Sequence, residues 1–301
     1  MNPLMRILLA MPHFFDAGGS DTTNRSRRAD AREERVHALV AAIAGAHQAL
    51  GSATYGLDHE KRTSWQMASP APHALDLVIC TSGGAHLLAE LAPLRLAFHH
   101  HATDADPMML GFECHKVLRD ARGRYDYVGY IEDDIVLLDP LFFRKRRLFD
   151  RHFGPGALLQ PNRYEASATG PVHKLYVDYR LNPRVTAAYQ NIAEEPRLDL
   201  PFLDGTVSFE RTPYPSAGCF FLNDEQLDIW TRSKNFLDGD VSYMSPLDSA
   251  ATLAIMKTFR IYKPVLDQAW FLEVLHASPR WISIAAGETR LVPARDISGG
   301  G

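Results

Sequence analysis

Three short runs of apolar, β-branched and aromatic residues predict buried strands in the first half of the chain. They cover residues 5–11 (MRILLAM), 74–81 (ALDLVICT) and 127–131 (YVGYI). Such runs are typical of strands that are covered on both faces of a sheet. A further strand is expected at 94–98, directly before His99, His100 and His101, which are interpreted as surface residues or as the edge of a substrate cleft.

Apolar residues at helical spacing alternate with these runs. One set predicts a helix over about 30–50, and a second set predicts a helix that Pro107 opens, in which Cys114 and His115 are packing and helix-surface residues. The two sets are Val36, Leu39, Val40, Ile43 and Leu50, and Leu110, Cys114, Val117, Leu118 and Ala121. Strands that alternate with helices favour an α/β fold, with a Rossmann-like mixed sheet flanked by helices.

The second half of the chain mixes strand and helix patterns. Residues 157–164, 216–222 and 261–265 predict strands, whereas 182–215 is expected to be irregular. Asn223 is expected to cap one helix, and Pro246 with Asp248 to start another. The stretch 141–153 places four basic residues (144–147) among apolar ones, which fits an ordinary amphipathic helix or one that rests on an anionic membrane surface.

Composition excludes several classes of protein. The 301 residues carry a net charge of -4, and this lack of basic excess argues against a nucleic-acid partner. The three cysteines are far apart and form no CxxC pair, so neither a disulfide framework nor a zinc site is expected. No run of 18 apolar residues occurs, and the first residues do not fit a signal peptide. A cytoplasmic protein is therefore expected.

Three consecutive carboxylates, Glu132, Asp133 and Asp134, follow the strand at 127–131. Adjacent acids at the end of a buried strand repel one another and lose hydration, so they favour a neutralising cation. Oxygen ligands suit Mg²⁺ or Mn²⁺. The alternative is that these acids are solvated loop residues that cap a following element.

The stretch YDYVGYIEDD resembles the DxD region of nucleotide-sugar-dependent glycosyltransferases of the GT-A fold, which act in bacterial glycan assembly. The resemblance implies that Glu132 contacts the nucleotide and that Asp134 binds Mn²⁺ or Mg²⁺. Asp133 is grouped with the nucleotide contacts, although the resemblance gives it no firm role. The implied fold is one GT-A-like domain of two abutting halves, a nucleotide-sugar-binding half (1–140) and an acceptor half (141–297), followed by a flexible tail (298–301).

Later segments match further parts of the same pattern. By resemblance, Ser216, Ala217 and Gly218 lie under the donor sugar, Asp248 is the base that faces the acceptor hydroxyl, and His276 is a second metal ligand. Each has an ordinary structural alternative: backbone packing for the small residues, a helix-dipole contact for Asp248 and a satisfied polar residue for His276.

A loop that contains glycines (12–24) precedes an arginine-rich stretch, which is a plausible cradle for phosphates. Arg25 and Arg28 are the candidates for this contact. The other arginines of the stretch are equally well explained by ion pairs with Asp30, Glu33 and Glu34 on a helix face.

Together these features predict a metal-dependent glycosyltransferase. It would move a sugar from a UDP- or GDP-sugar to a hydroxyl of a glycan or lipid-linked glycan, with peripheral contact to the inner membrane face as an option. The sequence leaves open whether the anomeric configuration is inverted or retained. Two alternatives remain: a nucleotidyltransferase, for which the loop lacks the expected lysine, and a non-catalytic nucleotide- or carbohydrate-binding protein.

Overall fold

The computed structural model describes residues 4–18, 25–69, 72–178, 181–285 and 287–292. Its centre is a five-stranded sheet in the order β13-β6-β1-β4-β5. Four strands are parallel and β13 is antiparallel to β6. The strands are β1 (Met5–Pro12), β4 (His73–Ser82), β5 (His99–Thr103), β6 (Tyr127–Ile131) and β13 (Cys219–Asn223).

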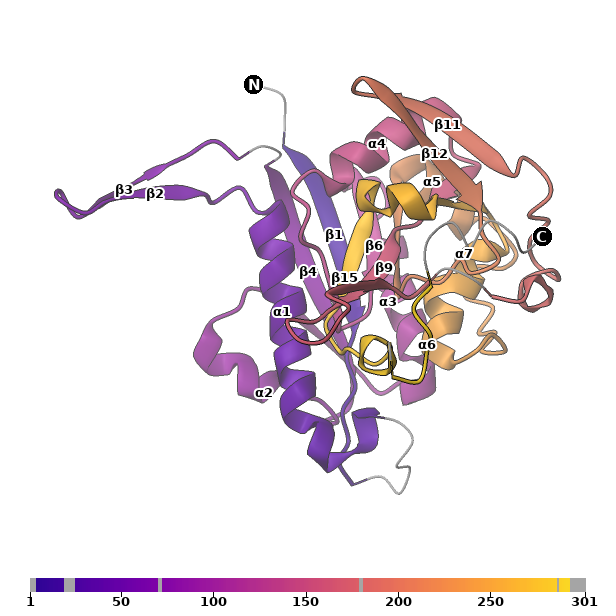
Figure 1. Cartoon of the computed structure of the whole chain (residues 1–301). Helices are drawn as coiled ribbons and strands as arrows, with labels where there is room; N and C mark the ends of the chain where they lie inside the picture. The colour runs from indigo at the N-terminus through magenta and orange to yellow at the C-terminus, as the bar shows by residue number, and fades with distance from the viewer. Residues whose placement is uncertain (1–3, 19–24, 70–71, 179–180, 286, 293–301) are drawn as a thin grey trace.

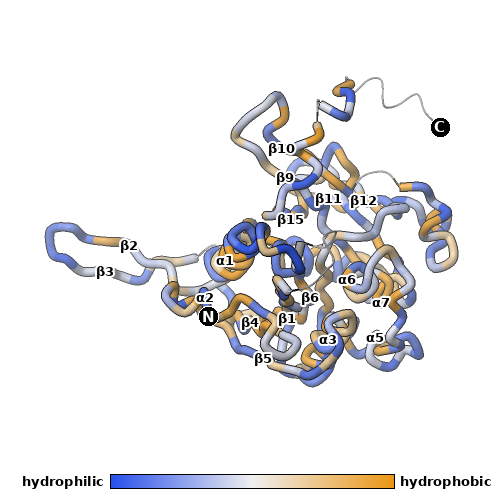
Figure 2. The backbone as a smooth tube through the Cα atoms, turned by 90° about the horizontal axis from the view of Figure 1, so that it is seen from below, coloured by the Kyte–Doolittle hydropathy of each residue, from blue (hydrophilic) through white to orange (hydrophobic). Residues whose placement is uncertain are grey.

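Two long helices cover opposite faces of this sheet, α1 (Arg32–Leu50) and α3 (Leu110–Asp120). Alternate residues of β1 enter two separate cores: Ile7 and Leu9 pack in the core that holds Leu39 and Ile43 of α1, whereas Leu8 and Ala10 pack in the core that holds residues of α3. Figure 2 shows β1, β4 and β6 lying between α1 and α3. Burial on both sides explains why these strands read as unbroken apolar runs.

Two further sheets and a hairpin complete the structure (Figure 1), in the orders β10-β9-β15-β7, β11-β12-β14-β8 and β2-β3. Their strands are β2 (Tyr55–Asp58), β3 (Thr63–Gln66), β7 (Ile135–Val136), β8 (Ala157–Leu159), β9 (Asn162–Ala166), β10 (Lys174–Tyr176), β11 (Arg197–Phe202), β12 (Gly205–Arg211), β14 (Arg260–Pro264) and β15 (Glu273–His276).

The other helical segments range from single turns to one helix of 12 residues. They are α2 (Leu88–Leu91), α4 (Phe142–Phe153), α5 (Asp224–Thr231), α6 (Pro246–Asp248), the π-helical turn η6 (Ser249–Leu253) and α7 (Ala254–Met256), with 3-10 turns η1 (Arg25–Arg27), η2 (Ala29–Ala31), η3 (Ala92–Leu94), η4 (Pro107–Met109), η5 (Pro183–Val185), η7 (Leu266–Phe271) and η8 (Ile282–Ile284). The predicted cap of α5 is confirmed, because Asn223 and Gln226 form a capping box.

Three expectations from the sequence are wrong. Residues 94–98 form no strand, because Leu94 closes η3 and Arg95 takes a left-handed φ of 51°; the strand begins at His99 and includes the histidines. The region 182–215 contains the β11–β12 hairpin, which turns through Leu203 and Asp204 directly before Gly205. His115 is not on the helix surface; it is fully buried.

The mixed α/β class is confirmed. The division into halves at residue 140 stays a prediction, and β13 of the second half adds to the sheet of the first. The tail at 298–301 lies outside the described residues. In the described ranges, no helix has the length and apolar character needed to span a bilayer. The basic residues of α4 do not share one face, because Arg146 is buried and donates to backbone carbonyls.

Candidate active site at the carboxyl end of the central sheet

The order of the central sheet creates a crevice between β1 and β6. From β1 the chain proceeds outward to β4 and β5 on one side, and it then crosses back to place β6 on the other side. In open α/β sheets, ligands bind outside the carboxyl ends of the strands at such a switch point. The acid triplet at the end of β6 therefore lies where this topology places a ligand.

A cavity of about 330 Å³ opens at this position. Its acidic side is the triplet, and much of the remaining wall is apolar. The lining residues are Pro12, Phe14, Ser26, Arg27, Arg35, Pro107, Met108, Leu110, Glu132, Asp133, Asp134, Ser245, Pro246 and Leu247. An apolar wall with a few converging charged groups is the usual character of a small-molecule site.

Asp133 is held by two protein partners. Nη2 of Arg35 lies 2.5 Å from both carboxylate oxygens of Asp133, and Nδ1 of His13 lies 2.6 Å from Oδ2. Nε2 of His13 accepts the backbone N–H of Leu87 at 3.1 Å, so the ring proton is on Nδ1 and is donated to Asp133. Asp133 therefore anchors the triplet to β1 and α1, and its contact with a nucleotide stays a prediction.

Asp134 faces His276. Oδ2 of Asp134 lies 3.4 Å from Nε2 of His276, and Nδ1 of His276 lies 2.9 Å from Oε1 of Glu165. Burial opposes ionisation of Asp134, but the hydrogen bond and charge of His276, with the charges of Arg35 and Arg163, outweigh it and lower the pKa of Asp134. The two predicted metal ligands thus lie side by side in the fold, although they are 142 residues apart in the sequence.

Asp134 and His276 could supply two ligands to a divalent cation at this point, and a bound substrate would have to supply others. In the metal-free protein Oδ2 of Asp134 lies 3.4 Å from Nε2 of His276 and 3.4 Å from Nη1 of Arg35, so a bound cation would replace these ion pairs. Glu165 forms a hydrogen bond with Nδ1 of His276, the ring nitrogen that faces away from Asp134. Carboxylates commonly orient metal-binding histidines in this way. Within the described residues, no three acidic, histidine or cysteine side chains are arranged to hold a metal, so further ligands would come from phosphate and water.

Glu132 and Asp248 form a second pair of carboxylates. Burial, followed by the charges of Asp248 and Asp134, raises the pKa of Glu132 to about 8. Burial also raises the pKa of Asp248, against a hydrogen bond from Ser245 whose Oγ lies 2.7 Å from Oδ2 of Asp248. Asp248 lies in the first turn of the helical segment, as the sequence predicts, and Ser245 is the N-cap of that segment. Glu132 lines the cavity and Asp248 directly follows the lining residues Ser245, Pro246 and Leu247, so two acids with raised pKa values near the cavity favour acid–base chemistry there.

Gly218 has no room for a side chain. Its φ is 64°, and a Cβ atom there would lie 2.9 Å from Cγ1 of Ile135 and 3.0 Å from Oε2 of Glu132. Its carbonyl accepts the N–H of Glu132 at 2.8 Å. Ser216 and Ala217 are fully buried, and the Ser216 carbonyl accepts a hydrogen bond from Lys263. Residues 216–218 therefore pack against the acid triplet. Their contact with a donor sugar stays a prediction.

The positive charge of Arg163 acts on Glu132, Asp134 and Asp248. Its Nε and Nη2 lie 3.2 and 2.9 Å from Oδ1 of Asp178, which also binds the buried Lys263. Burial opposes the charge of Arg163, but Asp178 and then Glu132 raise its pKa, and its charge acts in turn on Asp248. This cation stabilises closely packed acids in the absence of substrate.

The arginines after the first loop are placed differently from the prediction. The loop itself is described only up to Gly18, and the side chain of Arg25 lies outside the described part of the structure. Arg28 pairs with Asp30, and 43% of its side chain is exposed. Arg27 and Arg35 are the arginines that line the cavity, with Arg27 lying 5.6 Å from the ring centre of Phe14. Phosphate contacts by Arg25 and Arg28 remain predictions.

Four residues of the site were not identified from the sequence: His13, Arg35, Arg163 and Glu165. A signal existed for two of them. His13 directly follows β1, so it had to lie at the same sheet edge as the triplet. Arg35 precedes the buried Leu39 by four positions, which places it on the inward face of α1. No local pattern connects Arg163 and Glu165 with β15, because the β9–β15 pairing joins residues about a hundred positions apart.

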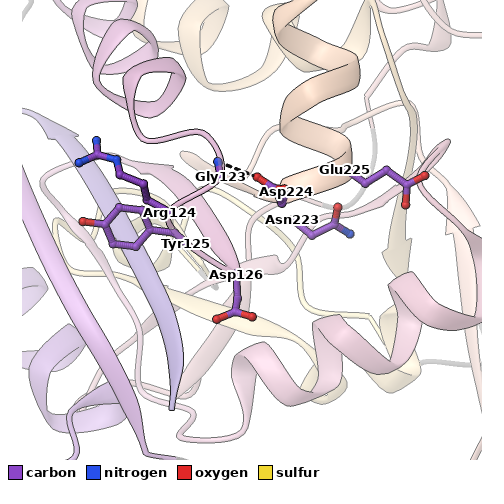
Figure 3. A pocket seen from close by; sticks show the side chains of 7 residues that line it. All are labelled: Gly123, Arg124, Tyr125, Asp126, Asn223, Asp224 and Glu225. Carbon is purple, nitrogen blue, oxygen red and sulfur yellow. Dashed lines mark hydrogen bonds between the residues drawn. The ribbon is translucent and has the colours of Figure 1, made fainter. Parts of the chain in front are cut away.

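A second hollow lies at the opposite end of β6 (Figure 3). It is lined by Gly123, Arg124, Tyr125, Asp126, Asn223, Asp224 and Glu225. Asp224 accepts the N–H of Gly123 at 3.0 Å, and Figure 3 shows Arg124 and Glu225 pointing away from each other. Since its charged groups do not converge and it lies at the amino end of β6, this hollow is the weaker candidate for a substrate site.

His276 makes the stability of the metal-free protein depend on pH. Burial disfavours its charge, but hydrogen bonds to Asp134 and Glu165 prevail and raise its pKa from 6.5 to about 9. Because the pKa is higher in the folded state, this stabilisation is complete below pH 6.5 and is lost as the pH rises through about 9. The loss amounts to at most about 3 kcal/mol.

We expect the free energy of unfolding in EDTA to fall more between pH 6.5 and pH 9 for the native protein than for His276→Gln. Urea titrations at the two pH values measure it. Ionisation of Glu132 occurs in both proteins, so it cancels in the comparison. Equal pH dependence in the two proteins would show that His276 is not held as a cation.

Comparisons with known proteins identify no family for this chain. No family model matches the sequence. No curated protein matches it either. Among solved structures, the chain is similar to that of S. aureus TarS 1-349 in complex with UDP, with a TM-score of 0.41 and 8% sequence identity. The similarity covers 86% of this chain and 57% of the TarS chain, so this chain spans somewhat more than half of its length. At this level of similarity we infer neither fold nor activity from it.

Proposed function

We propose that this protein is a metal-dependent glycosyltransferase that moves a sugar from a nucleoside diphosphate sugar to a hydroxyl group. The observation that carries the proposal is the meeting of Asp134 and His276 at the switch-point cavity, with Glu165 orienting the histidine. The raised pKa of Asp248, whose charge acts on Glu132, also favours an enzyme over a non-catalytic binding protein.

Asp134 and His276 would hold Mn²⁺ or Mg²⁺. Such an ion stabilises the negative charge that develops on a departing diphosphate. Glu132, whose raised pKa keeps it largely protonated at neutral pH in the metal-free protein, can donate a hydrogen bond to a donor hydroxyl. The apolar wall that includes Phe14 suits the flat face of a nucleobase.

Asp248 would receive the proton of the acceptor hydroxyl. Its raised pKa makes it a stronger base than an exposed aspartate, and it begins a helical segment whose preceding residues line the cavity. This role belongs to an inverting reaction. In a retaining reaction Asp248 would instead position a sugar hydroxyl. A glycan or lipid-linked glycan, near the inner membrane face, remains the proposed acceptor.

Thermal-shift screening of UDP-, GDP-, CMP- and dTDP-sugars, each with Mn²⁺ or with EDTA, tests the proposal. We expect one donor to raise the melting temperature by several degrees with Mn²⁺ and much less with EDTA, because the phosphate oxygens of the donor would be ligands of the bound ion. Incubation of a UDP-, GDP- or dTDP-sugar that binds should release the nucleoside diphosphate, whereas a CMP-sugar would release CMP. Release of inorganic diphosphate from a sugar phosphate and a nucleoside triphosphate would favour a nucleotidyltransferase instead. If no nucleotide stabilises the protein, the proposal is wrong.

A further inference from the structure

A β-hairpin projects from the body of the protein between α1 and β4. Helix-to-strand connections in α/β units commonly take about 2–6 residues, whereas here α1 ends at Leu50 and β4 begins only at His73. The added residues form β2 and β3, which pair antiparallel. A bridge between Gly51 and His73 closes the base, and both Figure 1 and Figure 2 show the hairpin extending away from the rest of the molecule. We call residues 54–67 the arm.

The arm exposes large apolar side chains on both faces. Tyr55 and Leu57 share one face and are 59% and 57% exposed. Trp65 and Met67 share the other face and are 52% and 47% exposed. A Cβ atom on Gly56 would lie 2.6 Å from the Trp65 ring, so the indole lies against bare backbone and is held in place. Exposed apolar groups in one place mark interaction sites, and a lone two-stranded hairpin is only marginally stable in water.

The tip of the arm indicates what kind of partner covers it. Residues 58–62 (DHEKR) contain two acids and two bases and are largely exposed. Insertion into a bilayer would bring all of these charges into lipid, and binding to an anionic surface would require a basic excess. Equal numbers of acidic and basic residues are instead complementary to a second tip of the same composition. In a two-fold arrangement, the acids of one tip meet the bases of the other.

We propose that two copies of this chain associate through the arm about a two-fold axis. The aromatic and aliphatic side chains of the two arms pack together, and Glu60 of each tip pairs with Lys61 of the other. The arm leaves the sheet at the amino end of β4, whereas the candidate active site lies at the carboxyl ends of β1 and β6. Association through the arm therefore leaves each cavity open, and this proposal stands independently of the proposed function.

Sedimentation velocity across a range of micromolar concentrations tests the association. We expect the native chain to dimerise and Leu57→Ser with Trp65→Ser to weaken the dimer by at least about tenfold, since buried aromatic anchors dominate interfaces. Leu203→Ser is the matched control, because Leu203 is 87% exposed on the turn of a different hairpin. The Leu203→Ser variant should dimerise with the native affinity. Circular dichroism confirms that each variant is folded.

Exchanging charges at the tip tests the symmetry. Glu60→Lys and Lys61→Glu should each weaken self-association, and an equal mixture of the two variants should associate again. A native chain that is monomeric throughout would overturn the proposal, as would a dimer that persists in the arm variants or a mixture that does not associate. Monomeric binding to anionic vesicles that depends on Trp65 would also overturn it, in favour of a membrane contact.

Discussion

Replacing Asp134 with Asn is expected to abolish metal-dependent sugar transfer, with a loss in kcat/KM of about a thousandfold or more. The change removes the carboxylate that faces Nε2 of His276 at 3.4 Å and leaves a neutral amide of the same size. Stabilisation of a departing diphosphate by a metal is worth several kcal/mol, and each 1.36 kcal/mol is a factor of ten in rate. Nucleoside diphosphate release from the donor found by thermal-shift screening measures the effect.

The matched control for this variant is Asp139→Asn. Asp139 lies five residues further along the chain, where it pairs with Lys145 at 2.7 Å outside the cavity lining. It should keep native activity and native metal dependence. If Asp134→Asn is folded and transfers sugar at the native rate with the native Mn²⁺ requirement, Asp134 is not a metal ligand.

Replacing Asp248 with Asn should lower kcat by about 10²–10⁴-fold, the usual contribution of a general base. Donor binding should stay close to native, because Asp248 is assigned to the acceptor and not to the nucleotide. The amide can still accept the hydrogen bond from Ser245, so the start of the helical segment is preserved. Rates at saturating donor and acceptor, together with donor-induced thermal shifts, separate the two effects.

Asp238→Asn is the control for Asp248→Asn, because Asp238 forms a partly exposed ion pair with Lys257 and does not line the cavity. A native kcat in Asp248→Asn would exclude the base. A joint loss of donor binding and rate would place Asp248 on the nucleotide instead. The anomeric configuration of the product then decides between proton removal in an inverting reaction and hydroxyl positioning in a retaining one.

The central strands could be predicted because each is buried on both faces. β1, β4 and β6 appear in the sequence as apolar runs for this reason, and their order along the chain already favoured an α/β sheet. β5 was misplaced because it is an edge strand with four exposed residues, so its histidines carry no apolar pattern. The β11–β12 hairpin was missed although its alternating leucines and the Asp204 and Gly205 that join its strands were visible.

Part of the site could also be predicted. The triplet was visible because three acids end a buried strand. Burial raises the pKa of Glu132, whereas His276, Arg35 and Arg163 lower that of Asp134, and binding of a metal by the triplet stays a prediction. The contact between Asp134 and His276 came only from a resemblance. It depends on β15 pairing with both β7 and β9, a long-range arrangement that no local pattern encodes. Arg163 was hidden for the same reason.

X-ray diffraction at the manganese absorption edge, from crystals grown with Mn²⁺ and the nucleoside diphosphate of the preferred donor, tests the central claim most directly. The proposed site predicts one anomalous peak that contacts both Asp134 and His276, with the diphosphate on the same ion in the cavity between β1 and β6. A nucleotide bound with no manganese at Asp134, or bound in the hollow at the opposite end of β6, would contradict it.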